Sequence, residues 1–525
     1  MENANPSPGM ACEPALQPQP EPSQKTLGTQ RQPRLKPVER RQLLLRTVDV
    51  EKLVPEDHPV RAIWALLGEM DLERFSVDVK AVDGSAGRAA WDPHLLAGLW
   101  IYAYSQAVSS AREISRLCEY HPAYQWLTAM GVINYHTLSD FRIQHKQALD
   151  ELFTQVLGVL SEADLITLER VMHDGTKVKA CASAKSFRRE ERLRAHLELA
   201  RQQVQQMGDP RCEELPERVA KARQRALREK QQRLASALEQ LQQIRAAKAS
   251  PSEHEQARAS STDPEARILL QSNGGYDPSY NVQISTDAQA RLIVGVGVSQ
   301  AANDAAELPP AVERVEANLK QLPAEMVVDA SFTNQPTIVA MEAKKINLIG
   351  ALPDRSAQTV AALQGRGIAP EFFPQAFVYE AAANSYTCPA GQTLRYEGRE
   401  KQGESLRYRY RAPAAACQSC PFKARCCPGT ARGRSLVRTE DSAVVAAFKA
   451  KMQTPEAQAI YKQRAGVAEF PNAWIKAKLG LRQFRLRGLV KVGLEALWAC
   501  LTYNIQQWIR LVWRPQRARL QASAA

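Results

Sequence analysis

The sequence predicts a mixed α/β fold in which helical segments come first and strands begin only further along the chain. Two observations carry this prediction. Between residues 48 and 165, apolar side chains recur at helical spacing, whereas from Arg170 onwards short apolar runs alternate with further helical patterns. The 525 residues, 44% hydrophobic and 24% charged, suffice for several domains and exclude wholly disordered or fibrous classes.

The predicted N-terminal helices follow a polar arm. Residues 1–47 are rich in Pro, Gln, Glu and Ser, which predicts a disordered arm. Residues 48–165 are expected to form an all-helical domain, because Pro55 and Pro59 mark a helix entrance and apolar residues then follow at helical spacing. Its further helices are predicted at 93–107, 111–120, 123–129 and 137–160.

A strand and a charged insertion come next. The run from Arg170 to Ala180 predicts a strand with a bend at Gly175. Residues 186–250 are charged and carry leucines at helical spacing, interrupted by prolines, so we expect two helices that form a coiled-coil hairpin or an exposed arm. A solvated insertion without chemistry is the favoured interpretation.

Strand patterns resume after the insertion and indicate an α/β layer with a mixed sheet. Strands are predicted at 280–287, 292–298, 326–329 and 346–352, the first two as a hairpin. Helices are predicted at 308–322 and 337–344. The predicted α/β domain therefore comprises residues 166–185, 251–380 and 441–513, the last of these helical. A cysteine-bearing module (381–440) interrupts it, and residues 514–525 are expected to form a flexible tail.

Charge and hydropathy narrow the function classes. The run Leu95–Ala111 is broken by polar residues, so we expect no membrane span, and the N-terminus lacks an apolar signal core. The net charge of +13 is unevenly distributed: residues 388–440 hold eleven Lys or Arg against four Glu, and residues 461–525 hold twelve against two. Basic excess confined to two segments is typical of a face that binds phosphates.

Two carboxylates stand out by their positions. Asp174 lies within the first predicted strand, and Asp329 ends a short apolar one. Carboxylates at strand ends of an open sheet lie at its rim, where active sites form. Carboxylates gathered there repel one another unless a hard cation neutralises them, so Mg²⁺ or Mn²⁺ is the expected cofactor. By themselves, two isolated aspartates are more often cap or turn residues.

A third acid lies in the basic C-terminal segment. Glu469 is one of two acids there, among Arg464, Lys476 and Arg482. On a helix, Glu469 and Lys476 lie two turns apart on one face. That arrangement suits a carboxylate on a metal ion and a lysine on a nearby phosphate.

These motifs together resemble the DDE transposases of bacterial insertion sequences, over nearly the whole chain from about residue 48. The matching segments are Asp174-Gly175-Thr176-Lys177, Val328-Asp329-Ala330, Tyr461-x2-Arg464-x4-Glu469-x6-Lys476, Ser109–Ile114, His136–Arg142, Tyr280–Gln283 and Gly480–Leu489. Each match is weak alone, whereas their order and combination are specific.

The resemblance implies a ribonuclease H-like catalytic core with Asp on the first strand, Asp after the fourth and Glu on a later helix. Asp174, Asp329 and Glu469 would then be the metal-binding triad. One branch of the family has three residues between Arg and Glu where this chain has four, so Glu495 is the alternative third acid. The resemblance implies that Tyr461, Arg464 and Lys476 position the DNA. The basic tail adds Arg482, Arg485 and Arg487 as candidate phosphate contacts.

The implied activity is metal-dependent cleavage at the element's terminal inverted repeats and transfer of the ends to target DNA. Synapsis of two ends implies a homodimer or larger assembly, located in the bacterial cytoplasm with the nucleoid. Two alternatives stay open: a nuclease of the same fold without strand transfer, and a catalytically inactive DNA-binding derivative.

Five cysteines crowd into forty residues: Cys388, Cys417, Cys420, Cys426 and Cys427. The spacing of Cys417 and Cys420 is that of a metal knuckle, which favours structural Zn²⁺ in a module too short for its own core. Cys388, Cys417, Cys420 and Cys426 are the candidate ligands, with Cys427 as the alternative to Cys426. Reduced thiols or, less readily, a disulfide are the other interpretations.

Some residues near these sites have ordinary structural explanations. Leu481, Phe484, Leu486 and Leu489 could be core residues with only the tail arginines exposed, or the tail could grip DNA, and both can hold together. His173 is expected to pack behind the first aspartate, because hard cations prefer oxygen ligands.

Overall fold

The computed structural model describes residues 47–77, 89–206, 216–248, 250–352, 356–403 and 405–524, together with Leu43, Leu45 and Val79. The arm predicted at 1–47 therefore lies almost entirely outside the described residues. Among the helices that are described, none combines the length and apolar character needed to cross a membrane.

The described residues of the N-terminal region form six α-helices, which agrees with the helical domain that the apolar spacing predicts. They are α1 (Pro59–Gly68), α2 (Pro93–Ser105), α3 (Ala111–Tyr120), α4 (Pro122–Leu127), α5 (Tyr135–Gln144) and α6 (Lys146–Glu162), with short 3₁₀ turns at Val50–Leu53 and Glu73–Ser76. Side-chain caps start several of them: Asp92 accepts from His94 N, and Asn134 accepts from His136 N.

One predicted helix is divided into two helices in the structure. The segment expected as a single helix at 137–160 is divided into α5 and α6 at His145, whose backbone leaves the helical region (φ −105°, ψ 54°). The His145 ring packs 5.6 Å from Phe75 and 5.2 Å from Phe141, so tertiary packing accompanies the break.

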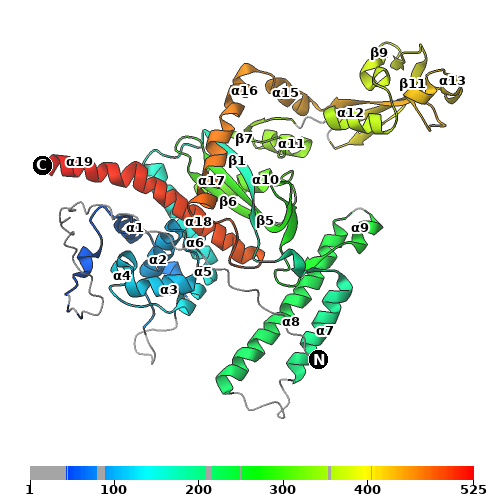
Figure 1. Cartoon of the computed structure of the whole chain (residues 1–525). Coiled ribbons are helices and arrows are strands. Elements are labelled where there is room, and N and C mark those ends of the chain that lie inside the picture. Colours follow the sequence, from blue (N-terminus) through cyan, green and yellow to red (C-terminus); the bar gives the residue numbers. More distant parts are fainter. Residues whose placement is uncertain are drawn as a thin grey trace, which may run out of the picture. The chain divides into compact units, whose positions relative to one another are not determined.

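The central sheet combines antiparallel and parallel pairing (Figure 1). Its strands are β1 (Arg170–Lys179), β4 (Arg267–Leu270), β5 (Tyr276–Asp287), β6 (Ile293–Ser299), β7 (Glu325–Val328) and β8 (Asn347–Gly350). β5 pairs antiparallel with β1, β4 and β6, while β7 pairs parallel with β1 and β8. This confirms the mixed α/β class and the predicted hairpin.

The helices described after β6 are α10 (Leu308–Leu319), α11 (Gln335–Ala343), α12 (Ser356–Gly365), α15 (Ala443–Lys451), α16 (Pro455–Lys462), α17 (Phe470–Ala477), α18 (Leu489–Trp508) and α19 (Arg514–Ala524). Of these, α10, α11, α16 and α18 contact strands of the central sheet. Two π-helical turns, Ala465–Glu469 and Ile509–Trp513, precede α17 and α19. α18 contacts β6, α2, α5 and α6, so the N-terminal helices and the sheet share one hydrophobic core.

The prediction of a flexible tail at 514–525 is wrong, because residues 514–524 form α19. This helix continues from α18 through a π-helical turn without interruption. Arg517 stacks over the Trp513 ring at 5.3 Å and pairs with Glu56 at 3.0 Å, which links α19 to the N-terminal region.

The charged insertion forms a helical hairpin of α7 (Glu190–Gln206) and α8 (Glu217–Ala246), followed by the short α9 (Pro251–Glu255) (Figure 1). Leu193, Leu197, Leu234 and Leu241 are buried between the two long helices. The short strands β2 (Phe187–Arg188) and β3 (Ala259–Ser260) pair at its base. The hairpin interpretation of the leucine pattern is therefore confirmed.

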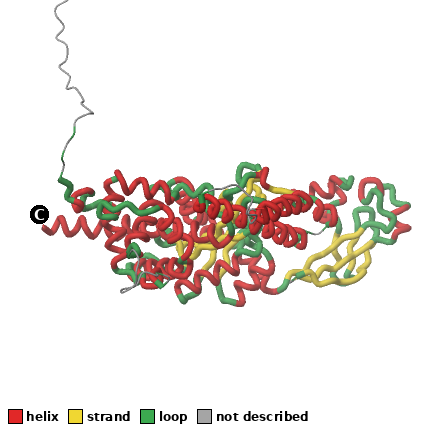
Figure 2. The backbone as a smooth tube through the Cα atoms, turned by 90° about the horizontal axis from the view of Figure 1, so that it is seen from below, coloured by secondary structure: helices red, strands yellow, loops and turns green. Residues whose placement is uncertain are grey.

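The cysteine-bearing segment (residues 378–441) contains a second sheet, and Figure 2 shows its strands as a group separate from the central sheet. The strands are β9 (Val378–Glu380), β10 (Ser385–Thr387), β11 (Thr393–Gln402), β12 (Ser405–Arg411) and β13 (Ser435–Asp441), with α13 (Ala414–Gln418) and α14 (Lys423–Cys426). Contrary to the expectation that this segment lacks a core, Phe377, Leu394 and Tyr410 are buried in a cluster of its own.

Candidate active site

Asp174 and Asp329 lie on neighbouring parallel strands. β1 and β7 are in register from Arg170 opposite Glu325 to Met172 opposite Val327. The same register places Asp174 level with Asp329, which directly follows the last residue of β7. Because neighbouring strands are about 4.8 Å apart, the two carboxylates belong to one site at the sheet edge.

Asp174 is a buried carboxyl with a perturbed pKa. The pKa of Asp174 is raised to about 6, chiefly by burial and with a contribution from the charge of Asp329, while Arg464 and a hydrogen bond from Asn472 oppose the increase. The Asn472 amide Nδ2 donates to Asp174 Oδ2 at 3.0 Å. Asn472, itself buried on α17, therefore holds the orientation of this carboxylate.

Glu469 reaches the same site through Arg464. The Arg464 guanidinium lies 3.6 Å from Asp174 Oδ1 and 3.6 Å from Glu469 Oε1. Its Nη1 is buried and makes no hydrogen bond within the part of the chain that the structure describes. Arg464 thus joins two of the predicted triad members by charge, without a directed hydrogen bond.

The turn between Arg464 and Glu469 is π-helical, at Ala465–Glu469. In a π-turn the residues five apart lie one above the other, as residues four apart do in an α-helix. The four residues between Arg464 and Glu469 are therefore accommodated while both side chains stay on one face. This turn also packs against β1, which places Glu469 beside the strand that carries Asp174.

Asp329 is fixed by the loop that follows it. Its Oδ1 accepts hydrogen bonds from Ser331 N at 2.7 Å and Ser331 Oγ at 2.6 Å. Thr333 Oγ1 donates to the Asp329 carbonyl at 3.1 Å. These bonds hold the carboxylate at the carboxyl end of β7.

A further carboxylate, Asp304, lies at this edge and was missed from the sequence. Its Oδ1 accepts from Asn281 at 2.6 Å and from Gln283 at 2.8 Å, and Lys177 lies 3.4 Å away. The signal was present, since β6 runs parallel to β1 and β7 and Asp304 follows its carboxyl end. Without the pairing of β5, that shared edge could not be recognised.

Gly175 lies in a straight strand and not at the predicted bend, because β1 pairs with β5 on both sides of it. A Cβ at this position would approach Asp304 Oδ1 and Gln283 Nε2 to 2.6 Å. Glycine is therefore needed at this position, because the side chains of Asp304 and Gln283 approach the backbone closely there.

Lys476 lies near the acids, and Tyr461 lies further back. Lys476 Nζ donates to Thr176 Oγ1, and burial lowers the pKa of Lys476 while the charge of Asp174 opposes that shift. Arg482 Nε donates to the Lys476 carbonyl at 3.3 Å. Tyr461 packs against the core, and no hydrogen bond of its hydroxyl is found in the described structure.

The basic tail has buried apolar side chains and exposed arginines. Leu481 and Phe484 are buried, whereas Arg482, Arg485 and Arg487 are exposed. The segment is held beside the end of β1, because Lys179 N donates to the Arg482 carbonyl and Phe484 N donates to the Lys179 carbonyl. The arginines are thus presented to solvent by an anchored backbone.

Glu495, the alternative third acid, serves a structural role. It is fully buried on α18, and its carboxylate accepts from Arg485 N at 3.1 Å and Leu486 N at 2.9 Å. Its hydrogen bonds hold the 485–486 loop, so Glu469 is the better third acid. His173 is likewise buried, bonded to Ser285 and Gln283, and burial lowers its pKa to about 4.

Neither predicted metal site is assembled as a ligand cage. Among the described residues, no group of three or more His, Cys, Asp or Glu side chains is arranged to hold a metal ion. The donor chemistry nevertheless fits: Asp174 and Asp329 form a pair whose repulsion a hard cation would relieve.

All five clustered cysteines line one cavity of about 20 Å³. Burial raises the pKa of Cys426 to about 12, and the neighbouring Cys427, Cys388 and Cys417 contribute. Backbone amides donate to two of the sulfurs, from Gln392 to Cys388 Sγ at 3.3 Å and from Arg434 to Cys417 Sγ at 3.4 Å. Converging thiols with amide donors suit a thiolate-bound ion. Cys118 and Cys500 are buried in the main core.

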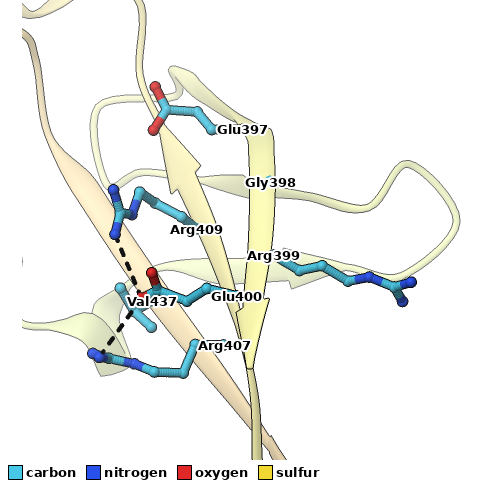
Figure 3. Close-up of a pocket in the computed structure, with 7 residues that line it drawn as sticks. All are labelled: Glu397, Gly398, Arg399, Glu400, Arg407, Arg409 and Val437. Atoms are coloured by element: carbon cyan, nitrogen blue, oxygen red, sulfur yellow. Dashed lines mark ion pairs between the residues drawn. The ribbon is translucent and has the colours of Figure 1, made fainter. Parts of the chain in front are cut away.

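The second sheet carries arginines on one face (Figure 3). Arg407 and Arg409 alternate along β12, and both approach Glu400 of β11, at 3.8 and 3.6 Å. Together with Glu397, Arg399 and Val437 they line a shallow cavity of about 430 Å³. Glu400 is thus shared by two arginines, and the segment keeps its basic excess.

Two parts of the chain match known protein families. Residues 48–144 match the family described as "Transposase domain (DUF772)", and residues 387–509 match the one described as "Transposase DDE domain". No curated protein matches the chain at a significant level. A solved structure with some likeness is the "Cryo-EM structure of piggyBac transposase synaptic complex with hairpin DNA", at 10% sequence identity and a TM-score of 0.30, covering 86% of this chain and 73% of that chain. A score this low establishes no common fold.

The two family matches lie in the parts of the chain where the resemblance placed them. The first contains the helices α1 to α5, and the second contains Arg464, Glu469 and Lys476 with the five clustered cysteines. Asp174 and Asp329 lie outside both. Both matched families are transposase families, so the two matches support a DDE transposase of an insertion sequence, an enzyme of DNA transposition.

Proposed function

We propose that this transposase cleaves phosphodiester bonds at the ends of its element and joins the freed 3′ hydroxyls to target DNA, with Asp174, Asp329 and Glu469 as the acidic triad. The observation that carries the proposal is the position of Asp174, which is level with Asp329 on the neighbouring strand and shares Arg464 with Glu469. Parallel pairing of β1 and β7 brings Asp174 level with Asp329, and Arg464 lies 3.6 Å from both Asp174 and Glu469.

The catalytic domain of the proposal is ribonuclease H-like. Leaving aside the edge strand β4, the strands in chain order are β1, β5, β6, β7 and β8, and the sheet runs β6-β5-β1-β7-β8. Asp174 then lies on the first strand, Asp329 follows the fourth, and Glu469 begins a later helix. This is the order that the family implies, with residues 166–185, 251–380 and 441–513 as the domain.

Asp174, Asp329 and Glu469 would hold Mg²⁺ or Mn²⁺, which prefer oxygen ligands. A divalent ion supplies activation of the attacking oxygen and charge stabilisation of the leaving oxygen. Side chains of the protein would orient the metal-binding carboxylates and contact the phosphate. Asn472 orients Asp174, Ser331 orients Asp329, and Arg464 is placed between two carboxylates, from where it can turn to a phosphate when they bind metal.

The DNA partner is bound, in this proposal, by Tyr461, Arg464, Lys476, Arg482, Arg485 and Arg487. Lys476 lies within the field of Asp174, and the three tail arginines are exposed on an anchored segment. The helical N-terminal region (48–165) and the α7–α8 hairpin (186–250) are assigned to recognition of the terminal inverted repeats and to contacts between subunits of a dimer or larger assembly on chromosomal DNA.

Structural Zn²⁺ is proposed in the cysteine-bearing segment, with Cys388, Cys417, Cys420 and Cys426 as ligands and Cys427 as the alternative to Cys426. Support comes from the five sulfurs that line one cavity and from the amide donors to Cys388 and Cys417. Zinc there would stabilise a segment whose own apolar cluster is small.

The direct test supplies pre-cleaved element ends, supercoiled target DNA and Mg²⁺ to the purified full-length protein. We expect joined products in which the 3′ end of the element is covalently linked to target. Hydrolysis of DNA without joined product would instead identify a nuclease, and neither product would indicate an inactive DNA-binding derivative.

A further inference from the structure

A shallow cavity of about 270 Å³ lies where the N-terminal helices meet the C-terminal basic tail. We call it the Ser109–Arg485 pocket. Its wall comes from the starts of α3 and α5, from Arg142 on α5, and from Arg485 of the tail. The pocket therefore joins the two family-matched parts of the chain.

Three guanidinium groups face this pocket, and no acidic side chain lines it. Arg485 Nε donates to Ser109 Oγ at 3.3 Å, and Arg112 stacks over the Tyr135 ring at 5.0 Å. Neither Arg112 nor Arg485 forms an ion pair with any residue that the structure describes. Both are exposed, so their charges remain available to a ligand.

Arg142 is the buried member of the set. Its side chain is only 5% exposed, Nη1 donates to the Ser109 carbonyl at 2.7 Å, and the guanidinium lies 4.6 Å from the Trp100 ring. Its Nε is buried without a hydrogen-bond partner in the described structure. Because Arg142 lines the pocket, its buried charge adds to the attraction of an anion there.

Two carboxylates of the surrounding elements, Glu113 and Glu495, already have partners. Glu113 pairs with Arg116 on the outer side of α3 at 2.8 Å. Glu495 lies within the field of Arg142, but its oxygens accept backbone amides of Arg485 and Leu486. The pocket thus keeps a net positive potential.

Two helix N-termini add to this potential. α3 begins at Ala111 with Ser110 as its cap, and α5 begins at Tyr135 with Asn134 as its cap. Residues of both first turns line the pocket, including Arg112 and His136. The partial positive charge of each helix start favours an anion there, and the hydroxyls of Ser109 and Ser139 supply further donors.

We propose that the Ser109–Arg485 pocket binds a backbone phosphate of the DNA on which the transposase acts. Guanidinium groups suit phosphate because they offer paired donors in one plane. The tail segment is bonded to the end of β1, the strand that carries Asp174, so one DNA strand can run from the acidic site to this pocket. The inference rests on the proposed function and adds to it a phosphate clamp built by both family-matched parts.

The test measures how DNA affinity depends on salt. The probe is a fluorescein-labelled duplex carrying one end of the element, bound by full-length protein with Asp174→Asn in the presence of EDTA, so that cleavage does not interfere. For Arg112→Gln we expect the slope of log affinity against log salt to fall by about 0.9, the value for one lost phosphate contact. The loss of affinity between 50 and 200 mM salt would then be about 3.5-fold smaller.

Two further variants test whether Arg112 and Arg485 contact the same phosphate or act only through the total charge of the protein. Arg112→Gln combined with Arg485→Gln should lower the slope no more than either change alone, because both arginines would hold the same phosphate. Arg116→Gln is the matched control, one helical turn along α3 and engaged with Glu113, and it should leave the slope unchanged.

If the slope of log affinity against log salt is the same for Arg112→Gln and for its Asp174→Asn parent, the pocket does not bind a phosphate. That conclusion would stand even if the wild-type protein still cleaves and joins DNA. Additive slopes in the double variant would also overturn it, since they mean two separate phosphates. A parent protein that binds no DNA would contradict both the pocket and the proposed function. Melting temperatures matched to the parent exclude misfolding as the cause.

Discussion

Arg464 and Glu469 lie 3.6 Å apart across one π-helical turn, although five positions separate them in the sequence. In an α-helix a residue five positions on points well away, whereas the wider π-turn brings it back to the same face. The extra residue relative to the shorter spacing of one branch of the family is thus absorbed locally, and Glu469 stays on the same face as Arg464.

This relationship predicts the effect of changing the length of the turn. Deleting Gly466, whose Cβ position is open, would leave Arg464 and Glu469 four residues apart, which an α-helix places on one face. We expect this variant to retain cleavage within about tenfold of wild type. Inserting Ala after Gly466 should lower cleavage by at least about a hundredfold, because it turns Glu469 away from Asp174. Equal activities of the two variants in a cleavage assay would contradict the importance of the turn.

Asn472→Ala tests the orientation of Asp174. Loss of the 3.0 Å hydrogen bond frees the carboxylate to rotate, and removal of a group that orients a metal ligand typically costs 10- to 100-fold in metal affinity or activity. We expect the Mg²⁺ concentration for half-maximal cleavage to rise by about tenfold or more. Asn334→Ala, which removes a helix cap outside the acid pair, is the control and should leave the Mg²⁺ requirement unchanged. An unaltered requirement in Asn472→Ala would mean that this amide does not act through metal binding.

Zinc content tests the cysteine-bearing segment. We expect about one Zn²⁺ per chain by elemental analysis, lost in Cys417→Ser and Cys420→Ser, since each would remove a thiolate ligand. Cys426→Ser and Cys427→Ser should differ, which would identify the fourth ligand. Cys181→Ser, outside this segment, should keep its zinc. Wild-type protein purified without near-stoichiometric zinc would show that the thiols are free.

Glu495→Ala should destabilise the fold and not act on chemistry alone. Its removal leaves two buried amides, of Arg485 and Leu486, without acceptors, at about 1–3 kcal/mol each. We expect the free energy of unfolding in urea to fall by about 2–5 kcal/mol, with a smaller loss in Glu495→Gln, which keeps one acceptor oxygen. A fully stable Glu495→Ala protein without cleavage activity would instead return Glu495 to the triad.

Local sequence patterns predicted the elements well where neighbours in sequence decide the conformation. Residues 111–120 form a helix as expected, and the hairpin of β5 and β6 follows from its alternating residues and turn. The break at His145 and the helix at 514–524 were not predictable in this way. The ring contacts of His145 and the contacts of Arg517 with Trp513 and Glu56 come from residues that are not recognised from local periodicity.

The site shows the same division. Asp174, Asp329 and Glu469 could be proposed from strand ends, helical spacing and a family resemblance. Asp304 and the pairing of Arg485 with Ser109 depend on which strands and helices become neighbours, a property of the folded chain. Gly175 was noticed but assigned to a bend, because its reason is the approach of Asp304 from more than a hundred residues away.

The most direct test of the triad compares three isosteric variants, Asp174→Asn, Asp329→Asn and Glu469→Gln, with Asp277→Asn in Mg²⁺-dependent cleavage and strand transfer. Asp277 is a carboxylate of the same sheet that pairs with Lys179 at 2.8 Å, away from the acid pair. We predict that each triad variant folds, binds DNA and loses at least about a thousandfold in both reactions, while Asp277→Asn stays within a few-fold of wild type. Wild-type cleavage by any one of the three triad variants would contradict its assignment as a catalytic acid.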